Sequence, residues 1–321
     1  MAFRLTPGAD ITQNVREIGR EQLDRSLSRF SAKDRKGNPV HETRKAMKRL
    51  RALLHLVKPA MRKSDFRRDE ARIKLIARSL SGVRDIQAME ETLAKLEDSE
   101  PSSVRSPVLE VLRAHLAEKR AAAEKDLSSA SLTKTRKLLR EARKSFDELT
   151  LQENDFHALA RTIKADYAKA RRSFQRAYEL REDEAFHDWR KYVQRHWRQL
   201  LLIAPCWPRA IKPHIALARD LSEVLGDDHD LFVLMGYVNA DRVTFGGDED
   251  VGRFLDLCRK RQADLRAAAE PMGKRLLAEK PSSLAARLCA YWITAQHVKG
   301  EDQAEDEEAD SAAPTPAPVS Q

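Results

Sequence analysis

Apolar residues recur at three- and four-residue intervals along almost the whole chain, a period that predicts α-helices. The 321 residues include only 11 glycines and 13 prolines, so few positions interrupt the pattern. No segment alternates polar and apolar residues for long enough to predict a strand. The sequence therefore predicts an all-α fold.

Prolines, glycines and polar segments divide this pattern into twelve expected helices. They cover residues 10–30, 40–57, 65–82, 84–97, 107–127, 132–149, 155–180, 184–204, 209–225, 228–241, 250–278 and 282–298. We expect a helix to end near Gly226 and another to begin there, because Asp227, Asp228 and Asp230 are suited to cap a helix N-terminus and to stabilise its dipole.

Two parts of the chain repeat each other. HETRKAMKRLRALLHLVKP, from His41, and HDWRKYVQRHWRQLLLIAP, from His187, share the histidine, the arginine three residues later, the lysine four later, the arginine eight later and the final proline at an offset of 146. LSGVRDI (80–86) matches LGDDHDL (225–231) at an offset of 145. Two matches at nearly one offset indicate an internal duplication. We therefore expect two pseudo-two-fold related bundles of six helices each, residues 1–151 and 152–299, around a basic cavity, followed by a disordered acidic and proline-rich tail at 300–321.

Both repeated segments place cationic side chains on one face of a helix. Each residue advances by about 100° around the helix axis, so positions 0, 3, 4, 7 and 10 share one broad face. Like charges at this spacing repel, and a basic face that lacks acids is suited to an anion, whose phosphate oxygens arginine can hold with two hydrogen bonds. The candidate binding residues are His41, Arg44, Lys45, Lys48 and Arg51 in the first segment, and His187, Arg190, Lys191 and Arg198 in the second.

The charge of the chain favours a polyanionic partner. The net charge is +9, but residues 301–310 contain seven acids and no base, so the rest of the chain carries +16. Nucleic acid, anionic lipid and polyphosphate all fit such a surplus. Aromatic residues make up 6% of the chain, fewer than a base-stacking surface requires; nucleic acid therefore stays the alternative to polyphosphate. Since no segment predicts a membrane span or a secretory signal, we expect a cytoplasmic protein.

A metal-dependent phosphohydrolase is the catalytic alternative. His229 and Asp230 could form its centre, with His187 and His214 as conceivable further ligands. However, Asp85 occupies the position of Asp230 in the first half and has no neighbouring histidine, which favours a structural role for the acids. We therefore expect no catalytic residue, metal or cofactor. Arg84 is expected to pair with Asp85 at a helix start.

The sequence resembles the CHAD family, the conserved histidine α-helical domain. The resemblance rests on His41-x-x-Arg44-Lys45-x-x-Lys48-Arg49-x-Arg51, on its repeat His187-x-x-Arg190-Lys191-x-x-x-Arg195-x-x-Arg198, and on Gly82-Val83-Arg84-Asp85. It covers nearly all of residues 10–299. It implies two pseudo-symmetric helical bundles around a basic cavity and, in some members, association with polyphosphate or polyhydroxyalkanoate granules.

By the same resemblance the chain would bind inorganic polyphosphate without catalysing a reaction. The contacts that the resemblance implies are His41, Arg44, Lys48, Arg51, His187, Arg190 and Arg198. The sequence departs from the family pattern at Gln194, where a second lysine is expected, and at His229, where the first half has Arg84. Both changes reduce the charge of the second half, so the two halves need not bind equally.

Overall fold

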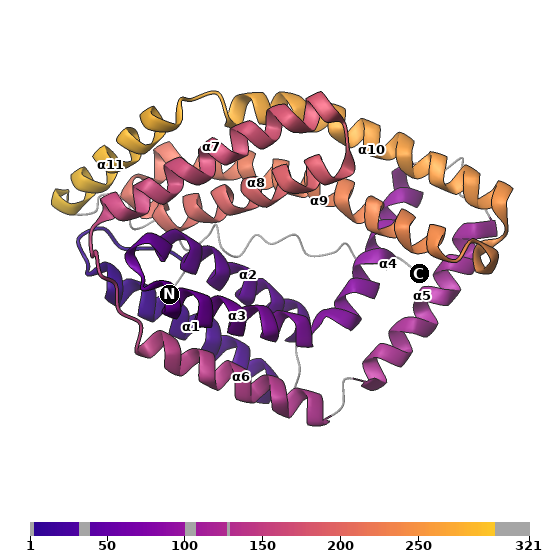
Figure 1. The fold of residues 1–321 in the computed structure, drawn as a ribbon, viewed down its shortest axis with the longest axis horizontal. Coiled ribbons are helices and arrows are strands. Elements are labelled where there is room, and N and C mark those ends of the chain that lie inside the picture. Colours follow the sequence, from indigo (N-terminus) through magenta and orange to yellow (C-terminus); the bar gives the residue numbers. More distant parts are fainter. Residues whose placement is uncertain (1–2, 32–38, 100–106, 127–128, 299–321) are drawn as a thin grey trace.

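The computed structural model describes residues 3–31, 39–99, 107–126 and 129–298. These residues form eleven α-helices and no strand, which confirms the all-α prediction (Figure 1). The helices are α1 (Ile11–Ser31), α2 (Pro39–Val57), α3 (Lys63–Ser79), α4 (Ser81–Ser99), α5 (Pro107–Asp126), α6 (Ser129–Asp147), α7 (Phe156–Leu180), α8 (Asp183–Ile203), α9 (Pro208–Ala240), α10 (Asp248–Leu276) and α11 (Pro281–His297). The expected tail at 300–321 lies outside the described residues.

The helices form an elongated molecule (Figure 1). One end contains α1, α2, α3 and α6, with α7, α8 and α11 above them, and the other end contains α4 and α5. The long helices α9 and α10 pack against each other and run between the two ends. This arrangement places α2 against α7 and α8, and α4 against α9.

Two apolar clusters hold these elements together. The larger cluster takes buried residues from α1, α2, α3, α6, α7, α8 and α11, together with the first part of α9 and the end of α10. The smaller cluster combines α4 and α5 with the second part of α9 and most of α10. Each cluster therefore draws on residues from both sides of position 151. The division into two duplicated halves stays a prediction.

The two repeated segments form the amphipathic helices α2 and α8. The apolar face of α2 is fully buried at Leu50, Leu53, Leu54 and Val57, and that of α8 at Trp189, Val193, Leu202 and Ile203. Burial of each such side chain contributes about 1.5–3 kcal/mol. Because these faces are fixed in the larger cluster, the basic faces of both helices are also fixed in direction.

The predicted break at Gly226 is wrong. Residues 208–240 form the single helix α9, so residues 152–298 contain five helices instead of the six expected. Gly226 is buried against the Arg190 guanidinium, with its missing Cβ position 3.8 Å from Nη2. A glycine inside a helix costs some stability but does not end it. Asp227 and Asp228 consequently bind partners on other helices instead of capping a helix.

Glycines allow close helix packing at two positions. A Cβ atom on Gly19 of α1 would overlap the Phe146 ring of α6. A Cβ atom on Gly273 of α10 would lie 2.7 Å from the Trp189 ring of α8. Both added atoms would lie closer than ordinary van der Waals contact. The packing of α1 on α6 and of α10 on α8 therefore depends on the absence of a side chain at these glycines.

We predict opposite effects for two glycine-to-alanine substitutions. Gly19→Ala should lower the free energy of unfolding by about 1–3 kcal/mol, since the added methyl group forces the Phe146 ring to move. A Cβ atom on Gly252 of α10 would meet nothing within 4 Å. Gly252→Ala should therefore raise the free energy of unfolding by up to about 1 kcal/mol through helix propensity. Urea unfolding followed by circular dichroism measures both. Equal effects of the two substitutions would contradict the close α1–α6 packing.

Candidate anion-binding site

The basic faces of α2 and α8 meet around Lys48. Burial by the surrounding helices, and then nearby positive charges, lower the pKa of the Lys48 ammonium to about 8. The charges that act on it come from three helices: Arg44 on α2, Arg84 on α4, and Arg190 and Arg198 on α8. We call these five residues the cation cluster.

Among the described residues Lys48 has no ion-pair partner, although its charge opposes the burial that raises the pKa of the Asp230 carboxyl on α9. The surrounding helices enclose its side chain, which still reaches solvent, and it makes no hydrogen bond or ion pair with another described residue. The charges that act most strongly on it are all positive. Bringing cations together in this way costs electrostatic energy that an added anion would relieve.

Arg198 and Arg190 bring two more cations to this point from α8. Burial, followed by the charges of Arg190, Arg49 and Arg51, lowers the pKa of Arg198 to about 10. The Arg198 guanidinium donates to the carbonyl oxygen of Gln194 at 3.0 Å, on its own helix. Arg190 has a buried Nε without a partner, and burial lowers its pKa although the charges of nearby aspartates raise it.

Arg44 also has a structural role. Its guanidinium donates to the carbonyl oxygens of Ala77 at 3.5 Å and Leu80 at 3.3 Å, and it pairs with Asp85 at 3.3 Å. It therefore joins α2 to the end of α3 and the start of α4. Arg84 bonds Glu91 at 2.5 and 2.9 Å, so the predicted pair between Arg84 and Asp85 is wrong.

Three other candidate residues lie at the edge of the cluster. Lys45 is exposed and lines a groove between α1 and α2. Lys191 is exposed and pairs with Asp188 at 2.9 Å. Arg51 lies 3.8 Å from Glu70 of α3. The structure thus brings Arg44, Lys48, Arg190 and Arg198 together and leaves these three around them.

The candidate histidines are kept neutral by their surroundings. Burial, followed by the charge of Arg84, lowers the pKa of His41. His187 Nδ1 lies 3.0 Å from His229 Nδ1, and the two rings stack at 4.2 Å. Burial, followed by the charges of Arg190, His187 and Lys191, lowers the pKa of His229 to about 4.

The contacts in the two halves are parallel. In the first half His41 lies near Arg84, and Arg44 pairs with Asp85. In the second half His187 contacts His229. Arg190 lies near Asp230, whose pKa is raised by burial against the opposing effect of the Arg190 charge. These pairs occupy the matching positions at the offsets of 146 and 145.

The acids that follow Gly226 bind cations on three helices. Asp227 pairs with Lys95 of α4 at 2.7 Å. Asp228 is buried and pairs with Arg266 of α10 at 2.7 Å. They therefore fasten α9 to α4 and α10, while Asp230 faces Arg190 of α8.

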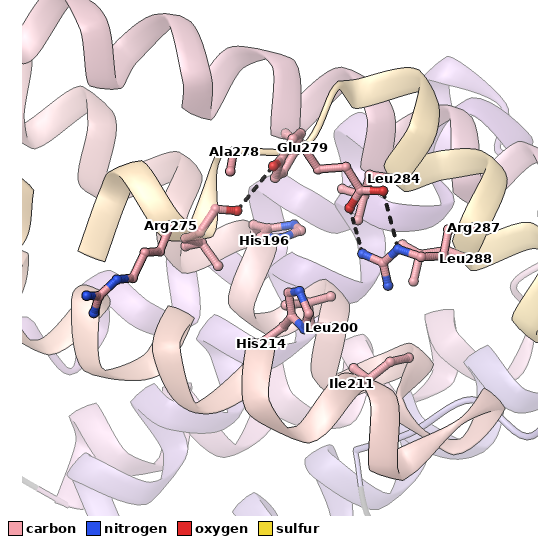
Figure 2. A pocket seen from close by; sticks show the side chains of 12 residues that line it. His196, Leu200, Ile211, His214, Arg275, Ala278, Glu279, Leu284, Arg287 and Leu288 are labelled. Carbon is pink, nitrogen blue, oxygen red and sulfur yellow. Dashed lines mark hydrogen bonds and ion pairs between the residues drawn. The ribbon is translucent and has the colours of Figure 1, made fainter. Parts of the chain in front are cut away.

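His214, a conceivable ligand of a metal centre at His229, lies in a different pocket. That pocket has a volume of about 160 Å³ and lies among α7, α8, α9, α10 and α11. Figure 2 shows His214 beneath the buried His196, with the Glu279–Arg287 ion pair beside them. Among the described residues, no three histidine, cysteine or acidic side chains gather as a metal site.

Sequence reasoning placed Arg84 in an ion pair and missed its part in the cation cluster. The signal was present, because Arg84 belongs to the LSGVRDI segment that repeats near residue 230. What it could not show is the direction of α4, which begins at Ser81 and carries Arg84 toward α2.

A family model of the CHAD domain matches residues 17–239, more than half of the chain. The chain therefore belongs to the CHAD domain family, which confirms the resemblance, and this family is linked to polyphosphate. None of the curated proteins matches the sequence. Within the described ranges, no helix is apolar over the length that a bilayer requires.

Solved structures show a similar fold. The crystal structure of the CHAD domain from the plant Ricinus communis has a TM-score of 0.53 at 16% identity, over 94% of this chain and 96% of that one. PptA from Streptomyces chartreusis has a TM-score of 0.58 at 12% identity, over 89% of this chain and all of that one. At such low identity, these likenesses concern the fold alone.

We predict that the histidine pair makes stability depend on pH. The pKa of His229 is about 4 in the folded protein and about 6.5 when unfolded, so the unfolded state binds more protons between these values. The contribution of neutral His229 is present above pH 6.5 and is lost as pH falls toward 4. His229→Gln should reduce the loss of unfolding free energy between pH 7 and pH 5 by on the order of 1 kcal/mol.

Urea unfolding at each pH measures this difference. His157 is exposed on α7, and His157→Gln is the matched control, which should keep the wild-type pH dependence. If both substitutions leave that dependence unchanged, His229 is not held neutral by burial and the surrounding cations.

Proposed function

We propose that this protein binds inorganic polyphosphate at the cation cluster and catalyses no reaction on it. The observation that carries the proposal is Lys48, whose strongest electrostatic neighbours are all cations from α2, α4 and α8. A chain of phosphates supplies repeated negative charge and acceptor oxygens, so one extended ligand can relieve the repulsion among all five residues.

The surroundings of the cluster favour polyphosphate over single-stranded nucleic acid. Proteins that bind single strands combine cations with aromatic surfaces on which bases stack. Here Trp189 is fully buried, and the ring of Trp197 is half-buried with the Arg198 guanidinium 5.2 Å above it. Burial therefore removes Trp189 from any stacking surface and Arg198 lies over the Trp197 ring, whereas the guanidinium and ammonium groups suit phosphate oxygens.

The roles that we assign are binding roles. Lys48, Arg190 and Arg198 neutralise phosphate charge, and Arg44 both contributes charge and fixes the position of α2. His41 and His187 donate hydrogen bonds from neutral rings at neutral pH, since burial lowers the pKa of each. We assign no residue a nucleophilic or proton-transfer role.

The test compares a cluster variant with a matched control. Lys48→Gln/Arg190→Gln/Arg198→Gln removes three cations that have no acidic partner within ion-pair distance among the described residues. Arg44 is kept because its bonds hold three helices together. Lys164→Gln/Arg172→Gln/Arg176→Gln removes equal charge from the exposed face of α7. Affinities for long-chain polyphosphate and for single-stranded RNA of matched length are measured over a range of salt concentrations.

We expect the cluster variant to lose at least about 100-fold in polyphosphate affinity. The slope of log affinity against log salt concentration should become shallower by about three. The α7 control should bind almost as the wild type does, and the wild type should prefer polyphosphate to RNA. Equal loss in both variants would show non-specific attraction by net charge. Equal affinity for the two polymers would favour the nucleic-acid alternative, and release of phosphate over time would favour the phosphohydrolase.

We also predict that polyphosphate affinity rises as pH falls from 7 to 5. A bound polyanion favours the protonated form of each nearby histidine, and the pKa values of His41, His187 and His229 are lowered without ligand. Binding should therefore take up protons. Calorimetry in two buffers with different ionisation enthalpies counts these protons. His187→Gln/His229→Gln should reduce the count, and an affinity independent of pH would contradict the assignment.

A further inference from the structure

A groove lies beside the cation cluster, between α1 and α2. Its volume is about 290 Å³. The two helices line it with matching faces, since in each helix the lining residues occur at positions i, i+3, i+4 and i+7. They are Gln22, Arg25, Ser26 and Arg29 on α1, together with Ser28, and Glu42, Lys45, Ala46 and Arg49 on α2.

Positive charge dominates this groove. Arg25 and Arg29 approach from α1, and Lys45 and Arg49 from α2, while Glu42 is the single acid among the residues that line it. Arg25 also pairs with Glu21 on its own helix at 2.5 Å, so part of its charge is compensated. The groove still carries a surplus of positive charge, which suits an anion.

The wall of the groove contains a buried hydrogen-bond donor without a partner. The Gln22 side chain is only 2% exposed. Its Oε1 accepts a hydrogen bond from Arg49 Nη1 at 3.4 Å, and its Nε2 is buried with no hydrogen-bond partner. Buried donors are nearly always paired in folded proteins. An anionic ligand in the groove would supply the missing acceptor oxygen.

The groove lies next to the cation cluster along α2. The charge of Arg49 helps to lower the pKa of Arg198 in the cluster, and the charge of Lys45 helps to lower the pKa of His41. Lys45 and Arg49 lie on the face of α2 next to the one that carries His41 and Lys48, because each residue turns the helix by about 100°. A linear ligand that leaves the cluster can therefore follow α2 into the groove.

We propose that this groove is a second subsite for the same polyanion, and that it selects for chain length. Short phosphate chains occupy the cation cluster alone. A longer linear chain continues over Lys45 and Arg49 and lies between α1 and α2, where Arg25 and Arg29 bind its phosphates and Gln22 donates to one of them. This inference rests on the proposed function of the cluster.

The test compares tripolyphosphate with long-chain polyphosphate. Arg25→Gln/Arg29→Gln removes the two α1 cations from an exposed surface, with little effect on folding. Arg172→Gln/Arg176→Gln is the matched control, because it removes two exposed arginines at the same i,i+4 spacing on α7. Glu42→Gln removes the acid from the groove and provides a variant that should gain affinity. Fluorescence competition at several salt concentrations measures all affinities, and circular dichroism checks each fold.

We expect Arg25→Gln/Arg29→Gln to weaken binding of the long chain about tenfold and to leave tripolyphosphate binding unchanged. For the long chain, the slope of log affinity against log salt concentration should become shallower by about two. Glu42→Gln should strengthen long-chain binding, and the α7 control should change neither affinity by more than about twofold. If the groove variant and the α7 control bind the long chain equally, the subsite is overturned. If the Lys48, Arg190 and Arg198 variant retains both affinities, the proposed function itself fails.

Discussion

Repulsion among Lys48, Arg190 and Arg198 is the constraint that the surrounding fold must oppose. The burial that lowers the pKa of Lys48 to about 8 and of Arg198 to about 10 is the same burial that weakens solvent screening between them. The opposing energy comes from the apolar faces of α2 and α8, which are fully buried in the larger cluster. Because that packing fixes both helices, the cations cannot turn away from one another. Under the proposed function, the cations are already arranged before the anion arrives, which lowers the cost of ordering the site upon binding.

Acids surround this cluster, but among the described residues none forms an ion pair with Lys48. Asp85 holds Arg44, Glu91 holds Arg84, and Asp227 holds Lys95. The Asp85–Arg44 pair joins α4 to α2 and the Asp227–Lys95 pair joins α9 to α4, so these two pairs also fix the position of α4. The outer cations therefore support the structure while Lys48 keeps its charge unpaired. Because Arg44 is one of the paired cations, a substitution there would disturb helix packing as well as binding, and the two losses could not be told apart.

Much of this arrangement could be predicted from the sequence, and the misses have physical causes. Helical period and the paired motifs at His41 and His187 are local patterns, so they predicted the all-α fold and both basic helices. The break at Gly226 was wrong because local propensity disfavours glycine in a helix, whereas in the structure Gly226 fits against the Arg190 side chain. The role of Arg84 and the distinct direction of Lys45 depend on how α4 and α1 approach α2. Such directions are set by packing between helices and cannot be read from spacing within one helix.

The most direct measurement of the central claim is the pKa of Lys48 itself. Nuclear magnetic resonance of selectively labelled lysine side chains can follow its titration with and without tripolyphosphate, with Lys48→Gln assigning the signal. The account predicts a pKa near 8 in the free protein, rising to the ordinary lysine range of about 10.4 or above when the anion binds. An ordinary pKa in the free protein that tripolyphosphate leaves unchanged would contradict the claim that α2 and α8 hold their cations together for a polyanion.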